Sequence, residues 1–256
     1  MPDLAGRLKR LEEKLSVRIG YFDEISSTND RAAAPEYGRR DVVWAESQTR
    51  GRGQRGNSGS SGAGENLTFS LVVCPENLPA EQQFYISKIV SVGLIEALAG
   101  SGVEAEIKWP NDIYIGDRKV AGILIENDLL GSRITKSVVG IGLNVNQAQF
   151  DPALPNPVSI YLATGKTVDR VEVLEKILER IFTWEEKLRA GQLAEIDRQY
   201  GQNLYRREGT HLFREPGGEP FSATIETVRP SGELLLRRTD GTLTPYLFKE
   251  VEFVIE

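Results

Sequence analysis

A stretch rich in arginine and glycine limits the fold of this chain more than any other segment. Between Arg50 and Gly56 it holds three arginines and three glycines in seven positions, and glycine and serine dominate the residues that follow up to Gly64. Such a segment breaks a helix, so the apolar runs on either side of it are predicted to be strands joined by a loop. Glycine amides and arginine side chains together favour an anion as the ligand of this loop.

Two nucleotide-binding motifs can be compared with this loop. The spacing Gly51-x-Gly53-x-x-Gly56 matches the dinucleotide-binding fingerprint, but that motif needs a helix directly after its glycines. A P-loop is excluded because no Gly-Lys-Ser/Thr sequence follows. From composition alone, a solvated Arg/Gly loop or an RGG-like nucleic-acid segment is an equally good interpretation. The net charge of −6 argues against nucleic acid as the main partner, because phosphate contacts dominate such binding.

Composition narrows the class of protein further. A chain of 256 residues that is 40% hydrophobic and 27% charged is expected to form one large domain, alone or with a small second one. The single Cys74 excludes internal disulfides and thiolate zinc sites and fits a reducing cytoplasm. The single His211 leaves no histidine-based metal cage and no obvious catalytic triad. No apolar run approaches the ~20 residues of a membrane span, and the start of the chain lacks a signal-peptide pattern.

Apolar spacing together with capping residues predicts the secondary structure. Helices are expected over residues 3–15, 80–99, 159–164, 169–189 and 192–202. Strands are expected over residues 19–25, 42–46, 67–74, 104–108, 113–115, 119–126 and 138–146. From residue 210 onward, short alternating runs with glycine-based turns predict a small all-β barrel. We therefore place a domain boundary near residue 203.

Polar residues follow one predicted strand, and glycines lie within another. Ser27, Thr28 and Asn29 follow the first strand, where they suit a helix N-cap and would also allow hydrogen bonds to a polar ring. Gly140 and Gly142 lie within the last strand of the larger domain. They indicate either the close approach of a ligand or backbone, or tight packing of a helix on the sheet.

A proline precedes the candidate residues Asn111 and Asp112, and a tight turn precedes Lys119. Pro110 lacks an N–H donor, so the strand ladder should stop there and leave Asn111 and Asp112 free from pairing. The Gly-Asp pair at 116–117 predicts a two-residue hairpin turn. That turn places Lys119 at the start of the following strand.

In their order and spacing, five motifs resemble the biotin–protein ligase family. The motifs are Ser27-Thr28-Asn29, Gln48 with Gly51-Arg52-Gly53-Gln54-Arg55-Gly56, Lys108-Trp109-Pro110-Asn111-Asp112, Lys119-Val120-Ala121-Gly122-Ile123-Leu124 and Gly140-Ile141-Gly142-Leu143-Asn144. The resemblance covers the chain from about residue 19 to its end. It implies an α+β fold, in which a mixed β-sheet with helices, like that of class II aminoacyl-tRNA synthetases, is followed by an SH3-like β-barrel. Residues 1–203 would form the catalytic biotin- and ATP-binding domain and residues 204–256 the barrel.

The resemblance also implies a reaction. The chain would be a biotin–[acetyl-CoA-carboxylase] ligase, which uses Mg²⁺ and ATP to convert biotin to biotinyl-5′-AMP. It would then transfer the biotinyl group to a lysine of a biotin carboxyl carrier protein in the cytoplasm. The short N-terminus is typical of the form without a DNA-binding winged helix, which is a ligase only. Neither nucleic acid nor a membrane is an expected partner, whereas a homodimer through sheet edges is allowed.

By the same resemblance, residues from three of these motifs would bind biotin. The ureido ring would be bound by Ser27, Thr28, Asn29 and Gln48. The tail and the phosphate would be held by Arg52, Gly53 and Gln54. Lys119 would pair with the biotin carboxylate and the α-phosphate as they meet, so its truncation should slow the chemical step more than it weakens biotin binding.

The nucleotide side of the site would be formed by a second set of residues. This set is Arg52, Arg55, Asn111, Asp112, Lys119 and Asn144. Among them Lys119, Arg52 and Asp112 would be catalytic, and Mg²⁺ would enter with ATP near Asp112. Asp112 would also receive the incoming lysine of the carrier.

Two positions depart from the family pattern. Gln54 stands where many relatives have arginine, and Gly59 stands where the family often has a tryptophan that covers the biotin tail and adenine. Losing a large aromatic side chain removes burial worth ~1–3 kcal/mol. We expect a loop that orders only with ligand and retains the adenylate weakly.

Three other functions are compatible with parts of the sequence. Lipoate or octanoate ligation uses a related fold, but that family lacks the Lys-Trp-Pro-Asn-Asp motif. A non-catalytic relative that only binds biotin or nucleotide would fit the changes at Gln54 and Gly59. An RNA-binding module built on the Arg/Gly loop would have to bind despite the negative net charge.

Overall fold

The computed structural model describes residues 3–50 and 64–255. Its centre is a seven-stranded sheet with the order β1-β2-β3-β7-β6-β5-β4. The pair β1–β2 is parallel and every other neighbouring pair is antiparallel. The strands are β1 (Ile19–Ile25), β2 (Val42–Gln48), β3 (Leu67–Val73), β4 (Glu106–Lys108), β5 (Asp112–Ile115), β6 (Arg118–Leu130) and β7 (Arg133–Leu143).

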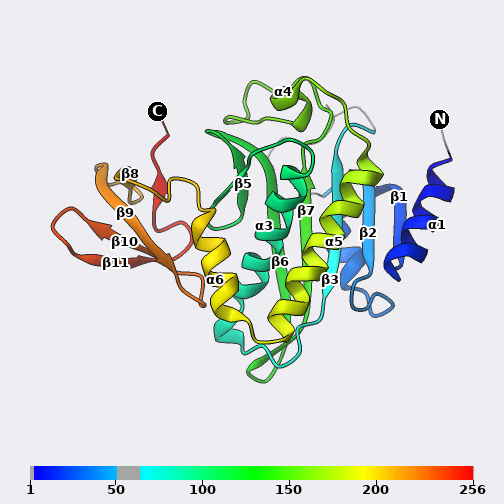
Figure 1. The fold of residues 1–256 in the computed structure, drawn as a ribbon, viewed down its shortest axis with the longest axis horizontal. Coiled ribbons are helices and arrows are strands. Elements are labelled where there is room, and N and C mark those ends of the chain that lie inside the picture. The colour runs from blue at the N-terminus through cyan, green and yellow to red at the C-terminus, as the bar shows by residue number, and fades with distance from the viewer. Residues whose placement is uncertain (1–2, 51–63, 256) are drawn as a thin grey trace.

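Helices cover the two faces of this sheet unequally. They are α1 (Leu4–Leu15), α2 (Thr28–Ala33), the 3₁₀ turn η1 (Ala80–Gln82), α3 (Phe84–Ala99), α4 (Ile160–Thr164), α5 (Arg170–Arg189) and α6 (Leu193–Gln202). In Figure 1, α3, α5 and α6 lie together in front of the sheet. An alanine side chain at Gly93 of α3 would come within 2.9 Å of the Ile181 backbone nitrogen, so glycine there lets α3 and α5 pack closely.

The two faces of the seven-stranded sheet differ in burial, because successive side chains of each strand point to opposite faces. On β7, Val139, Ile141 and Leu143 pack into the main core together with α3 and α5. The residues between them, Gly140 and Gly142, point to the opposite face, as successive strand residues do. On that face α2 packs a smaller apolar cluster over β2, β3 and β7. Within residues 3–50 and 64–255, the short α2 covers only part of this face.

The C-terminal part forms a separate antiparallel sheet, at the left in Figure 1. Its strands are β8 (His211–Arg214), β9 (Phe221–Val228), β10 (Leu234–Arg238), β11 (Leu243–Tyr246) and β12 (Glu252–Phe253), in the order β11-β10-β9-β8-β12. The predicted all-β C-terminal unit is therefore confirmed. Within the described residues its two outer strands do not pair with each other, so the sheet is open rather than a closed barrel.

The C-terminal sheet contacts the larger sheet beside one of the motifs. The indole nitrogen of Trp109 donates a hydrogen bond to the carbonyl oxygen of Gly232 at 2.8 Å. The backbone of Ile107 in β4 is paired with the segment 203–205. The domain boundary near residue 203 stays a prediction, and the chain on both sides of it lies against β4.

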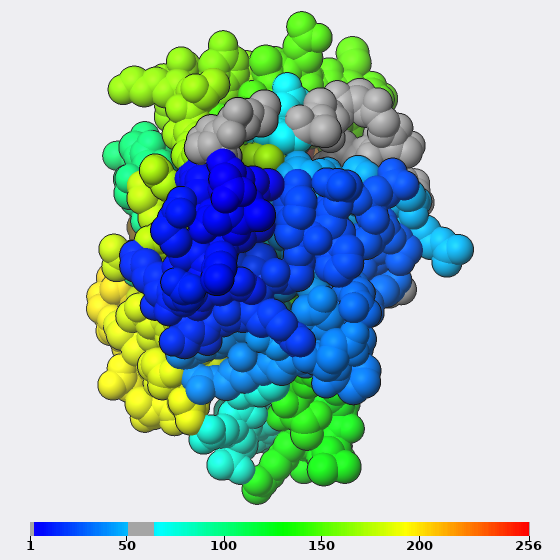
Figure 2. Space-filling model, turned by 90° about the vertical axis from the view of Figure 1, so that its right-hand side faces the viewer, coloured from blue at the N-terminus to red at the C-terminus, as the bar shows by residue number. Residues whose placement is uncertain are grey.

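The N-terminal helix closes the other end of the sheet. Figure 2 views the molecule from this side and shows the first residues, in blue, covering much of the surface. Leu8 and Leu11 of α1 are buried, and Arg7 pairs with Asp169 at the start of α5. The predicted amphipathic helix over residues 3–15 is thus confirmed.

Two strand predictions need correction. Asp112 is not free from pairing: it begins β5 and is paired with Lys108 on one side and Gly122 on the other. Asn111 is not free either, because its carbonyl oxygen accepts from the Ile123 N–H at 2.8 Å. A proline interrupts donation only at its own position, and the chain returns to the ladder at the next residue. The strand predicted over 119–126 continues to Leu130. The strand predicted over 138–146 begins earlier, at Arg133, and ends earlier, at Leu143. The two form a hairpin, β6–β7, with its turn at residues 131–132.

Candidate functional site

The partly open face of the large sheet carries a row of small and charged residues. Residues in register across five strands define this cross-strand row, which consists of Thr68, Gly142, Gly122, Asp112 and Lys108. All five are half-buried, and the residues on either side of Thr68, Gly142, Gly122 and Lys108 in the chain are fully buried. A Cβ atom built on Gly142 would meet no atom of residues 3–50 and 64–255 within 4 Å, so in the described part of the chain the middle of the row borders open space.

One side of this open space is formed by the start of α2. Ser27 is its N-cap, with a side-chain oxygen that accepts a hydrogen bond from the backbone N–H of Asp30 at 3.3 Å. The capping interpretation of Ser27 is therefore confirmed. Thr28 and Asn29 follow in the first turn, and all three side chains are buried at 3–4% exposure. Buried polar groups of this kind must find hydrogen-bond partners.

The partners of Thr28 come from β2 and β3. Gln48 Oε1 accepts from the Thr28 backbone N–H at 2.7 Å and lies 3.1 Å from its hydroxyl. The hydroxyl of Ser70 lies 2.8 Å from that of Thr28 and 2.6 Å from Asn29 Oδ1. The structure thus joins Thr28, Asn29 and Gln48, three of the four predicted ring-binding residues, in one hydrogen-bond network with the buried hydroxyl of Ser70, which was not predicted from the sequence.

Asn29 is held by the sheet beneath it. Its Nδ2 donates to the Glu126 carboxylate at 2.7 Å and lies 3.4 Å from the Leu124 carbonyl oxygen. A Cβ on Gly140 would come within 2.4 Å of Asn29 Oδ1, so only glycine leaves room for this amide. Gly140 is therefore explained by close packing of α2 on the sheet, one of the two alternatives that the sequence allowed. Both the oxygen and the nitrogen of the Asn29 amide thus have partners within the protein. Asn29 therefore connects α2 to the sheet and stabilises the position of its neighbour Thr28.

The other side of the open space carries Lys119. Its ammonium Nζ lies 2.6 Å from Asp112 Oδ1, and the two side chains keep 24% and 20% of their exposure. The Lys119 side chain runs over Gly122, where a built Cβ would lie 3.2 Å from Nζ. Two of the three residues predicted to be catalytic, Lys119 and Asp112, thus form an ion pair at the cross-strand row.

A β-bulge gives Lys119 this direction. The register between β5 and β6 shifts after Ile113, so that Tyr114 is opposite Lys119 while Asp112 is opposite Gly122. Lys119 and Gly122 are three residues apart, and in a regular strand they would point to opposite faces. The extra residue of the bulge turns Lys119 to the face of Asp112.

Two predicted nucleotide-side residues use their amides within the fold. Asn111 Nδ2 donates to the Ile123 carbonyl oxygen at 2.9 Å. Asn144 is 5% exposed, and its Nδ2 donates to the carbonyl oxygen of Val158 at 3.0 Å. Each of these two amides therefore links its own segment to the backbone of another segment of the fold.

Four predicted site residues, Arg52, Gly53, Gln54 and Arg55, lie outside the described residues, as does Gly59. The chain on either side of them is described. The backbone N–H of Arg50 donates to the Ser26 carbonyl oxygen at 2.9 Å, next to α2. Gly64 N–H donates to the Glu46 carboxylate at 3.0 Å, and Glu46 also pairs with Arg170. The described ends of this segment are thus attached to β1 and β2, whose carboxyl ends adjoin the candidate site.

Lys108 adds a positive group at the end of the cross-strand row. Its Nζ lies 4.8 Å from the ring centre of Tyr114 and 5.3 Å from that of Phe253. Burial lowers the pKa of Lys108 below its ordinary value, and the positive charge of Lys119 lowers it further, while Asp112 opposes the shift. From the sequence, Lys108 was recognised as part of the Lys-Trp-Pro-Asn-Asp motif, without a predicted role of its own.

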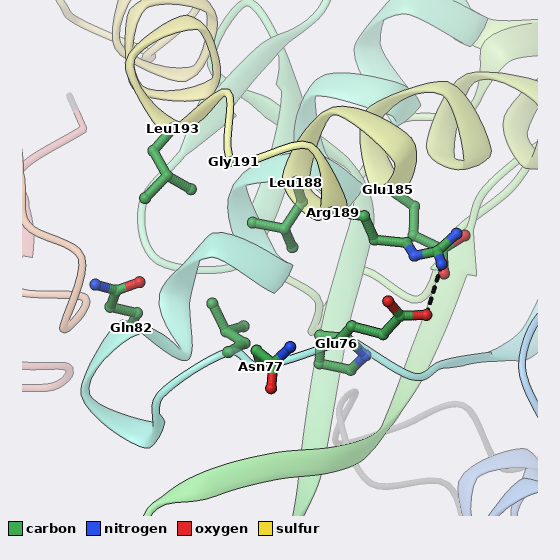
Figure 3. A pocket seen from close by; sticks show the side chains of 10 residues that line it. Glu76, Asn77, Gln82, Glu185, Leu188, Arg189, Gly191 and Leu193 are labelled. Carbon is green, nitrogen blue, oxygen red and sulfur yellow. Dashed lines mark hydrogen bonds and ion pairs between the residues drawn. The ribbon is translucent and has the colours of Figure 1, made fainter.

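Other features of the described residues do not form a second site of this kind. Within residues 3–50 and 64–255, no group of three or more His, Cys, Asp and Glu side chains is placed to hold a metal ion. None of the helices in this part of the chain is long and apolar enough to cross a membrane. A cavity of about 190 Å³ lies beyond the carboxyl end of β3, between Glu76 and Arg189, whereas the candidate site adjoins the other end of that strand. Figure 3 shows the ion pair of Glu76 with Arg189 at this cavity.

Known proteins match this chain over most of its length. The family model described as the Biotin/lipoate A/B protein ligase family matches residues 20–144. The biotin–[acetyl-CoA-carboxylase] ligase of Paracoccus denitrificans is 30% identical over 223 residues, which cover 84% of this chain and 92% of that protein. The structure of biotin protein ligase from Aquifex aeolicus in complex with biotin and ATP superposes with a TM-score of 0.75 at 25% identity. That match covers 93% of this chain and 99% of the other.

A bifunctional relative is matched over a shorter part. The bifunctional ligase/repressor BirA of Bacillus spizizenii is 33% identical over 178 residues, which cover 65% of this chain. The match spans 53% of the length of that relative.

Proposed function

Because the chain belongs to the biotin–protein ligase family, we propose that it activates biotin with ATP and transfers the biotinyl group to a carrier lysine. The observation that carries the proposal is the open space over Gly142, between the polar residues at Thr28 and the ion pair at Lys119. From Gly140, which underlies Asn29, to Gly122, which underlies Lys119, the sheet geometry gives a diagonal of roughly 8 Å. That length suits a ligand with a polar ring at one end and a chain of four methylene groups that ends in a carboxylate at the other.

The ring of biotin would be bound at α2. Its ureido group has two N–H donors and one carbonyl acceptor, and these need partners because each buried unsatisfied group costs ~1–3 kcal/mol. Ser27, Thr28 and Gln48 present hydroxyl and amide groups there. We propose that Asn29 acts through its contacts with Ser70 and the sheet.

The first reaction step would take place at Lys119. An oxygen of the biotin carboxylate attacks the α-phosphorus of ATP, a new P–O bond forms, and the bond to the pyrophosphate leaving group breaks. Lys119 would stabilise the negative charge that the two anions bring together, and Arg52 would hold the phosphate from the loop. Gly53, Gln54 and Arg55 remain proposed contacts of the tail and nucleotide, and Asn111 and Asn144 proposed positioning residues on that side.

The second step would transfer the biotinyl group. The amine of a carrier lysine attacks the carbonyl carbon of the mixed anhydride, the C–N bond forms, and AMP leaves as the C–O bond breaks. Asp112 is the nearest carboxylate to Lys119 and would receive the incoming amine and its proton. We propose a biotin carboxyl carrier domain as the partner and the cytoplasm as the place of reaction.

Mg²⁺ would enter with ATP as part of the substrate. Asp112 is the acidic residue in the cross-strand row, and its carboxylate is already paired with Lys119. A magnesium ion that keeps one or two carboxylates and several phosphate oxygens as ligands would suit this arrangement. The phosphates of ATP would then supply most of its ligands. A homodimer stays a prediction.

Pyrophosphate release tests the first step directly. We expect release from the wild-type protein with ATP, Mg²⁺ and biotin, and not with lipoate in place of biotin. Lys119→Ala should lower kcat about 10²- to 10³-fold, because a group that stabilises developing charge is lost. Its Kd for biotin, measured by calorimetry, should change much less. Lys176→Ala is the matched control, because Lys176 is an exposed lysine on α5, which covers the other face.

The outcomes separate the candidate functions. Release with lipoate alone would assign the chain to lipoate ligation. A folded wild-type protein that binds biotin and releases no pyrophosphate would be a non-catalytic relative. Equal losses in Lys119→Ala and Lys176→Ala would remove Lys119 from the reaction.

A further inference from the structure

The backbone of Lys119 is held by a segment from a distant part of the chain. Residues 156–158 run parallel to the start of β6 and form a bridge to Lys119. The Lys119 N–H donates to the Asn156 carbonyl oxygen at 2.8 Å, and the Val158 N–H donates to the Lys119 carbonyl oxygen at 2.9 Å. We propose that Asn156 is a positioning residue that keeps the Lys119 ammonium at Asp112. This inference rests on the proposed function, in which Lys119 stabilises the reacting anions.

Asn156 is suited to this place by its backbone and its side chain. Its φ is 40°, in the left-handed region that asparagine tolerates better than most residues other than glycine. Its Nδ2 donates to the carbonyl oxygen of Asp117 at 2.5 Å. One residue therefore joins the tight turn between β5 and β6 to the bulge that directs Lys119.

The segment 156–158 is fixed on its other side. The Asn144 side chain donates to the Val158 carbonyl oxygen at 3.0 Å, and the Asn144 backbone N–H donates to the Val120 carbonyl oxygen at 2.9 Å. The backbone groups of the bulge are thus satisfied by Asn144 and by residues 156–158. Removing the Asn156 side chain releases the link to the turn while these other bonds remain.

A small movement of the bulge would displace the ammonium group. The long side chain of Lys119 ends 2.6 Å from Asp112 and crosses Gly122 on the way. A reacting group must stay within about 0.5 Å and 10–20° of its productive position. A misplacement of about 1 Å, even from a change away from the reacting atoms, can slow a reaction about 100-fold.

Two substitutions at Asn156 test the proposal. Asn156→Gly keeps the left-handed backbone and removes the donor to Asp117, and Asn156→Asp replaces that donor with an acceptor. We expect both to lower kcat for pyrophosphate release by about 10- to 100-fold. The Kd for biotin should stay within about twofold of wild type, because the residues around Thr28 are untouched.

Asn77 provides the matched control. It is also a left-handed asparagine, with φ 60°, and its Oδ1 accepts from Arg133 at 2.6 Å. It lies beyond the carboxyl end of β3, beside the cavity in Figure 3 and away from the candidate site. Asn77→Gly should lower the melting temperature about as much as Asn156→Gly and leave kcat unchanged.

A second readout is independent of activity. Acetylation of Lys119 by acetic anhydride, followed by mass spectrometry, should be several-fold faster in Asn156→Gly than in wild type, because the ammonium is less firmly held at Asp112. A kcat equal to that of Asn77→Gly, or a biotin Kd that weakens as much as kcat falls, would overturn the inference. If the wild type releases no pyrophosphate, the proposed function fails, and unchanged acetylation of Lys119 would then overturn the positioning role as well.

Discussion

Replacing Gly142 with alanine is expected to leave the fold intact and to block the ligand. A Cβ atom at this position meets no atom of the described residues within 4 Å, so the methyl group enters the space that they leave open over the sheet. Alanine also loses less backbone entropy than glycine on folding, which favours it by roughly 0.5–1 kcal/mol in a strand interior. The free energy of unfolding should therefore stay equal or rise by about that amount.

The same methyl group should weaken binding. A ligand that reaches from Asn29 to Lys119 along this face crosses Gly142, which lies between Gly140 and Gly122 in the sheet register. The new bond from Cα is about 1.5 Å long, so a ligand in contact with the glycine would have to rise by about that distance. We expect the Kd for biotin to increase at least tenfold, which corresponds to about 1.4 kcal/mol.

Gly140→Ala is the matched comparison, two residues away on the same strand and face. Its methyl group would lie 2.4 Å from Asn29 Oδ1 and 3.1 Å from Asn29 Cγ. Asn29 is held by Ser70 and Glu126, so it cannot move without losing a buried hydrogen bond, at a cost of ~1–3 kcal/mol. For a chain of this size each 1 kcal/mol lowers the melting temperature by roughly 2–4 °C.

Thermal unfolding and biotin calorimetry on both variants distinguish these effects. The expected pattern is a stable Gly142→Ala that binds biotin weakly and a destabilised Gly140→Ala. Wild-type biotin affinity in Gly142→Ala would refute the path of the ligand over this residue. A melting temperature for Gly142→Ala as low as that of Gly140→Ala would refute the open space itself.

Two further substitutions test the electrostatics and hydrogen bonding of the site. Burial lowers the pKa of Lys108 from the ordinary 10.5, so the folded state binds fewer protons than the unfolded state and stability rises with pH between the two pKa values. Lys108→Met keeps contact with the rings of Tyr114 and Phe253 and should raise the melting temperature at pH 7. This gain in melting temperature should shrink as pH approaches 10.5. A gain that does not depend on pH would contradict the lowered pKa of Lys108. Gln48→Ala leaves the buried N–H of Thr28 without its acceptor, so the free energy of unfolding measured in urea should fall by ~1–3 kcal/mol and biotin binding should weaken. Gln48→Glu keeps an acceptor oxygen and should stay near wild-type stability. A loss below about 0.5 kcal/mol in Gln48→Ala would show that another group replaces that acceptor.

Elements with local signals could be predicted from the sequence. Leucines at helical spacing marked α1, and the caps Ser159 and Asp169 accept the expected backbone hydrogen bonds at the starts of α4 and α5. The Gly-Asp pair at 116–117 forms the predicted turn, with Ile115 opposite Arg118. These signals depend on residues close in sequence, so the sequence alone was sufficient.

Elements that depend on distant pairing were predicted less well. The β6–β7 hairpin continues through Asn127 and Asp128, which have low strand propensity, because Ser137 and Lys136 pair with them across the hairpin. A register shift next to Leu129 accommodates this stretch. Neighbouring strands decided the outcome, and their contribution cannot be recognised within a short window of sequence.

The candidate site also combines features that nearby residues predict with features that depend on distant segments. Ser70 lies inside an apolar run, and its single hydroxyl was the available signal that this position faces a polar group. The motif with Lys119 identified a candidate residue but not its direction, since three residues separate it from Gly122 and a regular strand would place them on opposite faces. The bulge that brings both to one face exists because Asn156 and Val158 supply partners to the Lys119 backbone. The motif thus predicted which residue types form the site. Their geometry depends on residues 156–158, almost forty residues further along the chain than Lys119.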